Sequence, residues 1–430
     1  MLPKKEEIRD KVVLVGLNSP VLREDSATEE SMDELSALVE TAGGETAGIV
    51  LQNRATPDPR TFIGEGKVAE VQLYVENVGA TMVIFDNDLS PSQQRVLTEL
   101  LGIQVLDRCG LILDIFAQRA KTKEGRLQVE LAQYRYLLPR LTGMWTHLER
   151  QAGTSGKGPI GSKGPGETQL ETDRRLINKK IDKIRADLEE VRRVRATQRQ
   201  QRQKNEIPVV AIVGYTNAGK STLLNTLSGA DVLAEDKLFA TLDPVVRTVK
   251  MPAGGEFLLV DTVGFISKLP HALVDAFHST LEEALLADVL LVISDGASGE
   301  MIHQHDVVLE VLASLGAADK PKIDVINKAD LPDVNANKWP GAIAVSAKMG
   351  KGLDELLEAI RLKLRGAARL MRALIPYAQG GLLAKLHEDG QVLSEEYTGE
   401  GIEVKALADE QLFGRLTVQL GEQAVSWQDD

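Results

Sequence analysis

Residues 214–221 have the types and the spacing of a phosphate-binding loop. They read Gly-Tyr-Thr-Asn-Ala-Gly-Lys-Ser, which fits the pattern G-x-x-x-x-G-K-[ST], and they follow an apolar run at 209–213. Glycines permit a tight turn whose backbone N–H groups point at phosphate oxygens, and the helix that starts there adds a favourable dipole. We therefore expect Lys220 to neutralise the β- and γ-phosphates of a nucleotide and the Ser221 hydroxyl to bind Mg²⁺.

Two further segments predict how the phosphates and the metal are sensed. Asp261-Thr-Val-Gly264 follows the apolar run 257–260, which puts a carboxylate near the metal and the Gly264 N–H near a γ-phosphate. Phe239-Ala-Thr241-Leu-Asp243 lies between that segment and the loop, and its threonine hydroxyl supplies a second Mg²⁺ contact. The predicted catalytic residues are Lys220, Thr241 and Gly264, and the predicted metal ligands are Ser221 and Thr241.

Two more segments predict which base is bound. The Asp330 carboxylate can accept hydrogen bonds from guanine N1–H and the 2-amino group, a pair that adenine cannot supply. Asn327 buttresses this loop, the aliphatic stem of Lys328 can cover the base plane, and the Ala347 N–H can reach guanine O6. The four segments at 214–221, 261–264, 327–330 and 346–348 stand in order, each after its own apolar run, and together they predict a GTPase; a small-molecule kinase is disfavoured by Asn327–Asp330.

The predicted nucleotide-binding set gathers the residues of these segments. It comprises Gly214, Tyr215, Thr216, Asn217, Ala218, Gly219, Lys220, Ser221, Phe239, Ala240, Thr241, Leu242, Asp243, Asp261, Thr262, Val263, Gly264, Asn327, Lys328, Ala329, Asp330, Ser346, Ala347 and Lys348.

Two positions bear on how hydrolysis proceeds. Phe265 stands where many GTPases carry a glutamine that orients the attacking water, and a phenyl ring cannot do this. Intrinsic hydrolysis should therefore be slow, and a partner or an ion must complete the site. Asn217 lies where some GTPases bind K⁺ through an asparagine oxygen; a polar residue that merely stabilises the loop is the alternative, and both remain open.

The nucleotide segments need a sheet to position them. Apolar runs at 207–213, 257–260, 289–293, 322–326 and 342–345 predict its strands, with a helix at about 351–365. We assign residues 207–370 to a P-loop GTPase domain. Residues 371–430 contain three strand-like runs around one short helix and form a small α+β domain.

The middle of the chain, residues 111–206, predicts a helical hairpin. Two series of apolar residues are spaced alternately by four and three positions, as in a coiled-coil seam. The first is Leu127, Leu131, Tyr134, Leu138, Leu141, Trp145 and Leu148, and the second is Ile177, Ile181, Ile184, Leu188 and Val191. Pro139 should kink the first helix. Residues 149–166 between the helices are basic and rich in glycine, so we predict a tip loop that contacts a partner.

Residues 1–110 alternate short apolar runs with amphipathic stretches. The runs lie at 12–17, 47–52, 82–85 and 104–106, and the stretches near 31–42, 67–79 and 91–101. This alternation predicts a parallel sheet covered by helices. The expected fold is therefore α/β: an N-terminal parallel α/β domain, a helical coiled-coil hairpin, a P-loop GTPase domain and a small α+β C-terminal domain.

Charge is distributed unevenly along the 430 residues. The net charge of −13 argues by itself against a nucleic-acid partner, but residues 117–206 carry 21 basic and 11 acidic side chains. The rest of the chain is correspondingly more acidic, and phosphate contacts are predicted in the basic middle. The lone Cys109 excludes an intramolecular disulfide, and the chain shows neither an apolar run of membrane length nor the apolar core of a signal peptide.

Several segments carry a family resemblance. The chain resembles the HflX family of ribosome-associated GTPases in GYTNAGKSTL (214–223), LFATLDP (238–244) and DTVGFI (261–266). The likeness extends to GLILDIFAQRA (110–120), EGRLQVELAQ (124–133), GPGETQLETDRR (164–175) and FIGEGK in the N-terminal domain. It covers nearly the whole chain except the last 60 or so residues, and the family also has a hydrophobic residue at the position of Phe265.

The resemblance implies a function. It implies GTP-dependent binding to the large ribosomal subunit and splitting of stalled or stress-idled ribosomes, with the hairpin entering near the peptidyl-transferase centre and its tip loop contacting ribosomal RNA. We expect a cytoplasmic monomer that meets membranes only through ribosomes. The alternative is a nucleotide-gated RNA-binding scaffold or ribosome-assembly factor without splitting activity.

Overall fold

The structure is a computed structural model that describes residues 9–141, 165–203, 207–229, 238–251, 255–268, 283–332, 334, 339–364, 369–408, 410–421 and 423–428. The backbone divides into two compact units. The first unit comprises Met1–Lys204, Glu235–Asp243 and Val263–Leu281, and the second comprises Asn205–Ala234, Pro244–Thr262 and Glu282–Asp430. Within the described residues, no helix is both long enough and apolar enough to cross a membrane.

The N-terminal part of the first unit is a parallel sheet, as predicted. Its strands pair in the order β2-β1-β3-β4, and every neighbouring pair is parallel. Capping boxes at Thr28 and Ser90 fix the starts of two of its helices, because each hydroxyl accepts the backbone N–H three residues later. The elements are β1 (Lys11–Asn18), α1 (Glu29–Ala42), β2 (Glu45–Asn53), α2 (Glu65–Val78), β3 (Met82–Phe85), α3 (Pro91–Leu101) and β4 (Gln104–Asp107).

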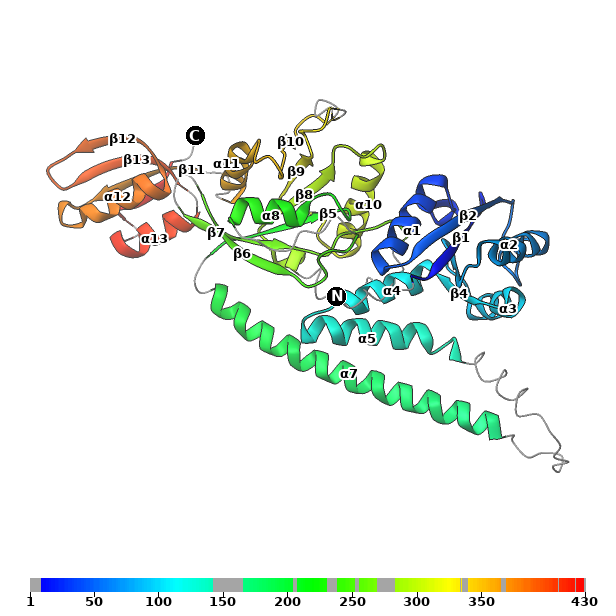
Figure 1. Ribbon diagram of the computed structural model, residues 1–430. Helices are drawn as coiled ribbons and strands as arrows, with labels where there is room; N and C mark the ends of the chain where they lie inside the picture. Colours follow the sequence, from blue (N-terminus) through cyan, green and yellow to red (C-terminus); the bar gives the residue numbers. More distant parts are fainter. Residues whose placement is uncertain are drawn as a thin grey trace, which may run out of the picture. The chain divides into compact units, whose positions relative to one another are not determined.

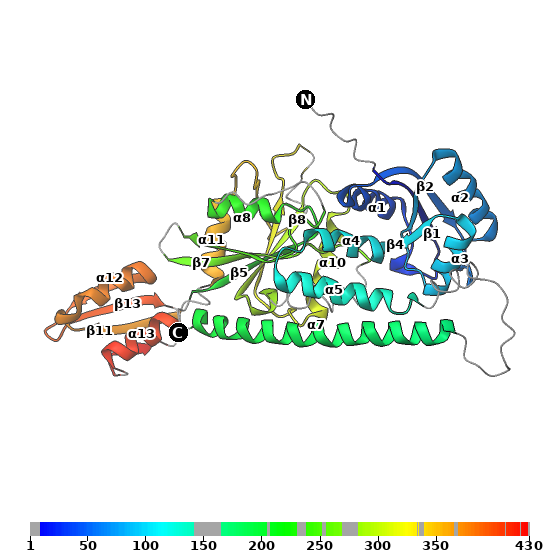
Figure 2. The ribbon, with the colours of Figure 1, turned by 60° about the horizontal axis from the view of Figure 1, so that its bottom comes forward.

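The helical hairpin follows this sheet. It consists of α4 (Arg108–Arg119), α5 (Lys123–Leu137) and α7 (Pro165–Gln203), and α5 lies alongside α7 in Figure 1 and Figure 2. The predicted seam is confirmed for eight of its twelve residues, which form one apolar cluster between the two helices. The buried members are Leu131, Ile181, Ile184 and Leu188, and Leu127, Tyr134, Leu138 and Ile177 pack against them.

Pro139 ends a helix where a kink was expected. Helix α5 stops at Leu137, and residues 138–140 form a turn. Leu138 still has helical dihedral angles and donates its N–H to the Tyr134 carbonyl oxygen, but Pro139 has no N–H group to continue this series of hydrogen bonds, so the helix ends there. Trp145, Leu148 and the loop residues 149–164 lie outside the described residues.

The second unit contains the sheet that positions the nucleotide segments. Its strand order is β10-β9-β8-β5-β7-β6, parallel throughout except for β6. Helices α8 and α11 contribute to one apolar core against this sheet, while α10 contacts β5 and β8 (Figure 2). The elements are β5 (Val209–Gly214), α8 (Lys220–Ser228), β6 (Val245–Lys250), β7 (Glu256–Asp261), β8 (Val289–Asp295), α10 (Met301–Ser314), β9 (Lys322–Asn327), β10 (Ile343–Ala344) and α11 (Leu353–Leu364).

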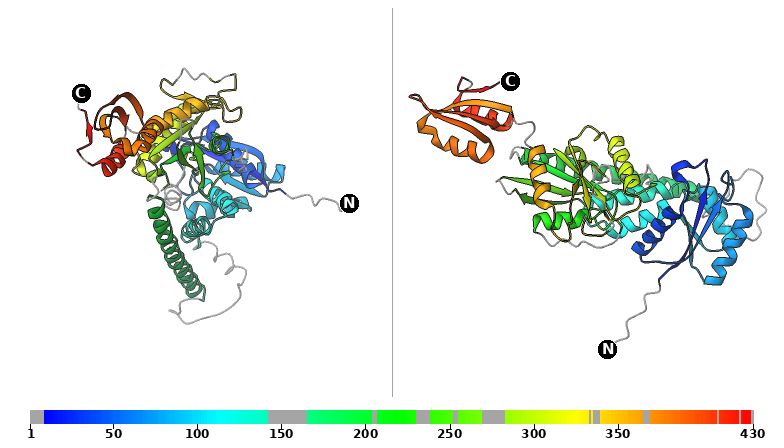
Figure 3. Two further views of the ribbon diagram at one scale, coloured as in Figure 1. Left: turned by 90° about the vertical axis from the view of Figure 1, so that its left-hand side faces the viewer. Right: turned by 90° about the horizontal axis from the view of Figure 1, so that it is seen from above.

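The C-terminal module has a βαββαβ order. Its antiparallel sheet runs β12-β13-β11-β14, the ferredoxin-like arrangement, and it is coloured orange to red in Figure 3. The sequence predicted three strands and one helix here; the structure adds a second helix and a fourth strand. The elements are β11 (Arg369–Ile375), α12 (Gly380–Asp389), β12 (Gln391–Tyr397), β13 (Ile402–Ala408), α13 (Glu410–Leu420) and β14 (Val425–Trp427).

Candidate guanine-nucleotide site

The loop between β5 and α8 has the backbone of a phosphate cradle. Gly219 has a φ of +90°, a conformation that L side chains rarely adopt. A methyl group built on it would collide with the Asn327 side-chain amide, and one built on Gly214 would collide with the Ile293 carbonyl oxygen. Both glycines are therefore required by the fold, and a glycine-rich turn between a strand end and a helix start is the arrangement in which backbone N–H groups bind phosphate.

Lys220 and Ser221 open helix α8 at this loop. The Lys220 ammonium donates to the Tyr215 carbonyl oxygen over 2.6 Å, and burial lowers the pKa of Lys220 to about 8 against the opposing effect of Asp261. The Ser221 hydroxyl donates to the buried Asp261 carboxylate over 2.6 Å. A hydroxyl and a carboxylate so close together form an oxygen donor set that suits Mg²⁺, which takes few protein ligands and completes its shell with phosphate and water.

Asn327 connects the phosphate loop to the base-recognition loops. Its amide nitrogen donates to the Ala218 carbonyl oxygen over 2.8 Å, and its amide oxygen accepts the Ala347 N–H over 3.0 Å. The residue is 2% exposed, so both hydrogen bonds are shielded from water. Asn327 thus holds three of the predicted segments in one arrangement.

The predicted base-binding carboxylate is held but remains exposed. The Ser346 hydroxyl donates to one oxygen of Asp330 over 2.6 Å, and this hydrogen bond is the main reason that the pKa of Asp330 is lowered. The carboxylate is therefore charged at neutral pH. The Lys328 ammonium pairs with Asp295 at 2.6 Å, which fixes the lysine stem beside the loop.

Asp295 is a residue that sequence reasoning missed. It is the last residue of β8, at the same sheet edge as Asn327, the last residue of β9, so its position after an apolar run was the available signal.

Two further residues, Asn217 and Thr216, lie in the phosphate loop. Asn217 is exposed with a φ of +59°, and Thr216 is 6% exposed, with a hydroxyl that has no hydrogen-bond partner within the described residues. A buried hydroxyl of this kind on the loop fits a bound phosphate.

The remaining predicted residues occupy both units. Thr262 belongs to the second unit, and its hydroxyl donates to the Ile212 carbonyl oxygen over 2.7 Å. Phe239–Asp243 and Val263–Gly264 belong to the first unit. There the Asp243 carboxylate accepts hydrogen bonds at the start of α5, and Phe265 is buried at 1% exposure.

Family models match most of the chain. Residues 29–117 match the model described as GTP-binding GTPase N-terminal, residues 119–202 match GTP-binding GTPase Middle Region, and residues 209–328 match 50S ribosome-binding GTPase. The GTPase HflX of Caldanaerobacter subterraneus subsp. tengcongensis is 50% identical over 378 residues, which are 88% of this chain and 87% of that protein.

The chain belongs to the HflX GTPase family. Two further HflX GTPases agree: that of Lacrimispora saccharolytica is 45% identical over 96% of each chain, and that of Escherichia coli K12 is 44% identical over 86% of this chain and 87% of its own. Like its family, this HflX protein is a GTP-binding enzyme that hydrolyses GTP, and such GTPases use Mg²⁺.

A solved structure also aligns with this HflX chain. The crystal structure of SsGBP in complex with GDP is 25% identical and covers 82% of this chain and 97% of its own, with a TM-score of 0.48.

Proposed function

We propose that GTP binds along the carboxyl edge of the second unit's sheet, with the residue roles predicted above. Residues 214–221 take the phosphates, with Lys220 neutralising their charge and Ser221 and Thr241 binding Mg²⁺. Asp330 selects guanine, Lys328 covers the base, and the Ala347 N–H meets its carbonyl. The observation that carries this proposal is the pair of hydrogen bonds in which the Asn327 amide donates to the Ala218 carbonyl oxygen and accepts the Ala347 N–H, because it joins the phosphate and base segments.

Hydrolysis should be slow in the free protein. No glutamine follows Gly264, and Phe265 is buried, so this chain supplies no side chain at that position to orient the attacking water. The Gly264 N–H and Thr241 sense the γ-phosphate, and a partner completes the site. We propose that Asn217 also binds K⁺, in which case hydrolysis is faster in K⁺ than in Na⁺ and the difference disappears in Asn217→Ala.

We propose that the partner is the large ribosomal subunit and that this monomeric protein splits stalled or stress-idled ribosomes. The match to a model of 50S ribosome-binding GTPases supports the partner, and the 21 basic residues of 117–206 suit contacts with RNA phosphates. The GTP-bound protein binds and hydrolysis releases it.

The deciding experiment measures GTP hydrolysis with and without purified large subunits. We expect stimulation in the wild type and none in Lys220→Ala, the control without the phosphate-binding ammonium. An unchanged rate on adding subunits to the wild type would overturn the proposal.

A scaffold that binds ribosomes without splitting them is the second candidate. Sedimentation of intact ribosomes with the protein and a non-hydrolysable GTP analogue separates the two, since only splitting raises the fraction of free subunits. Deleting residues 150–166 should leave GTP affinity intact and reduce splitting; undiminished splitting would remove the tip loop from the mechanism.

A further inference from the structure

Residues next to Thr241 in the sequence anchor its segment in the first unit. Phe239 is 2% exposed, and its ring meets that of Phe116 in α4 edge-to-face, with centroids 4.7 Å apart. Leu242 is buried to the same extent. Two residues after Thr241, the Asp243 carboxylate contacts a helix of the same unit.

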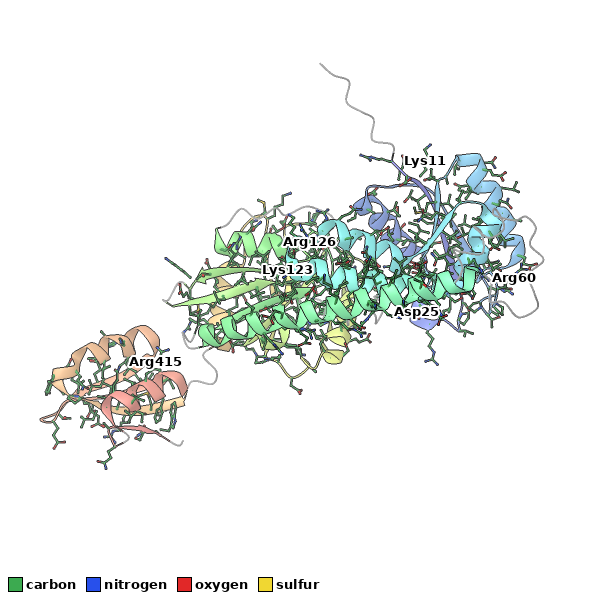
Figure 4. The ribbon with its side chains drawn as sticks, turned by 90° about the horizontal axis from the view of Figure 1, so that it is seen from below. Lys11, Asp25, Arg60, Lys123, Arg126 and Arg415 are labelled. Carbon is green, nitrogen blue, oxygen red and sulfur yellow. The ribbon has the colours of Figure 1, made fainter. Side chains whose placement is uncertain are left out.

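Asp243 binds the start of helix α5. Its carboxylate accepts the backbone N–H groups of Lys121 and Thr122 over 2.8 and 2.9 Å, and it also accepts the Thr122 hydroxyl. Thr122 is the N-cap of α5, and its hydroxyl oxygen in turn accepts the Gly125 N–H over 3.0 Å. Figure 4 labels Lys123 and Arg126 in this first turn. A carboxylate at this end of a helix is also favoured by the helix dipole.

Gly125 makes room for this contact. A methyl group built on Gly125 would collide with the Asp243 carboxylate. Glycine is a poor residue for a helix interior, and alanine is the best one, so helix stability alone does not explain a glycine here. The close approach of Asp243 does explain it.

Lys268, in the segment that follows β7, is also anchored in the first unit. The Lys268 ammonium pairs with Asp86 and donates to the Ser31 hydroxyl over 3.2 Å. Asp86 has no exposed side-chain surface, and its other oxygen pairs with Arg108 at 2.8 Å. Lys268 follows Gly264 by four positions, so the segment on that side of the nucleotide residues is also tied to the first unit.

Both anchored segments carry backbone strain. Phe239 has a φ of +54° and Lys268 a φ of +55°, and bulky residues adopt this left-handed conformation only where surrounding contacts hold it. The ring contact of Phe239 and the ion pair of Lys268 are such contacts. Strained segments held by a few contacts are suited to change conformation between two states.

We propose that Asp243 is a positioning residue through which the nucleotide state acts on the helical hairpin. Thr241 responds to the γ-phosphate, which rests on the function proposed above, and two residues span about 7 Å at most. A displacement of Thr241 therefore pulls on Asp243 and on the N-terminus of α5. Helix α5 packs against α7 through Leu131, Ile181 and Ile184, so the displacement reaches both arms of the hairpin.

Hydrogen exchange of the full-length protein tests this coupling. In the wild type we expect residues 119–126 to exchange at rates that differ by about fivefold or more between GDP and a non-hydrolysable GTP analogue, the lower end of typical coupling between sites. In Asp243→Ala and in Gly125→Ala the two rates become equal; in Gly125→Ala, which lies outside the predicted nucleotide-binding set, both nucleotides still protect residues 214–221.

Two further variants separate coupling from folding. Gly125→Ala places a methyl group where the Asp243 carboxylate lies, so it breaks the same contact from the α5 side while raising the helix propensity of α5. If both Asp243→Ala and Gly125→Ala lose the difference in exchange rate between the two nucleotides, the loss cannot come from a weakened helix. Glu130→Ala removes an exposed carboxylate from the same helix and should keep the difference.

The results separate the two proposals. Rates at residues 119–126 that do not respond to nucleotide in the wild type, or that still respond in both Asp243→Ala and Gly125→Ala, would overturn the coupling. A wild type in which neither nucleotide protects residues 214–221 would overturn the nucleotide site itself and the coupling with it.

Discussion

Within the described residues, the N-terminal sheet is parallel and the sheet of the second unit is parallel except for β6, and the two differ in the groups at the carboxyl ends of their strands. In the sheet of the second unit, β5 runs into a loop with Gly219 at a positive φ, and β9 ends at Asn327, which bonds to backbone groups of two loops. In the N-terminal sheet, β3 is followed by Asp86 and β4 ends at Asp107, and these carboxylates bind arginines of the same unit.

The N-terminal strand ends are filled by the protein's own side chains. Arg108 is 1% exposed and pairs with Asp86 at 2.8 Å and with Glu34. Arg140 pairs with Asp107 at 2.9 Å and donates to the Leu89 carbonyl oxygen over 3.0 Å. A buried carboxylate must be paired, and here arginine and lysine side chains of the chain do so.

The same architecture therefore serves two purposes in this chain. Ligands of open α/β sheets bind beyond the carboxyl ends of the strands. In the sheet of the second unit, glycines, backbone N–H groups and the exposed Asp330 lie at that edge. The other uses the same edge to anchor Arg140 of the hairpin and Lys268 of the segment after β7.

The largest effect should come from breaking the ion pairs at the carboxyl ends of the strands in the N-terminal sheet. Asp86→Ala leaves Arg108 and Lys268 without their shared partner, which should cost about 3–5 kcal/mol of local stability. Hydrogen exchange of β1 and β3 measures this opening free energy. Asp33→Ala, an exposed carboxylate on α1, is the control; if both variants behave alike, the edge is not held by charge.

A smaller effect should come from filling the phosphate cradle. Gly219→Ala forces an L residue to φ +90° against the Asn327 amide, a strain of about 1–3 kcal/mol, which would weaken GDP binding by about 5- to 150-fold if nucleotide binding bears the whole cost. Gly229→Ala is the matched control, since Gly229 also has a positive φ but meets nothing within 4 Å. Equal GDP affinity of the two variants would contradict a cradle at Gly219.

The smallest effect is a proton taken up with the nucleotide. Burial lowers the pKa of Lys220 to about 8, so the free folded protein carries only about half of this proton at pH 8, whereas a free lysine keeps it until pH 10. Bound phosphate raises the pKa again. Calorimetry of GDP binding in buffers of different ionisation enthalpy should therefore show uptake of about half a proton at pH 8 and about a tenth at pH 7. Equal uptake at both values would mean that Lys220 keeps an ordinary pKa.

The same linkage fixes the sign for stability. Between pH 8 and 10 the unfolded chain binds more protons at Lys220 than the folded protein does. The contribution of Lys220 to the free energy of unfolding therefore rises with pH across that window in the nucleotide-free protein, and bound GDP reduces this rise.

The sequence predicted what depends on local spacing. The heptad positions of Leu131, Ile181 and Ile184 predicted the seam of the hairpin, and the structure confirms it. The alternation of apolar runs predicted both parallel sheets. The phosphate loop was predicted because its glycines and Lys220 stand within eight residues, and its chemistry stays a prediction until nucleotide binding is measured.

The contacts between distant segments could not be predicted in this way. Asp243 was assigned to the nucleotide, yet it binds Thr122 across 121 positions of the chain, and Lys268 meets Asp86 across 182. No sequence periodicity relates residues so far apart in the chain, and the charge of Asp243 or Lys268 does not by itself indicate its partner. Only the folded chain shows that Gly125 leaves space for Asp243.

The contrast between the two sheets is tested most directly by titrating GDP into matched variants. Asp330 follows β9 and Asp88 follows β3, so each carboxylate stands beyond the carboxyl end of a strand. Asp330→Asn should weaken GDP binding about 100-fold or more, because the amide cannot accept both guanine hydrogen bonds. Asp88→Asn should bind GDP as the wild type does. Equal affinity in all three proteins, or a loss confined to Asp88→Asn, would contradict the assignment of the nucleotide to the second unit's sheet.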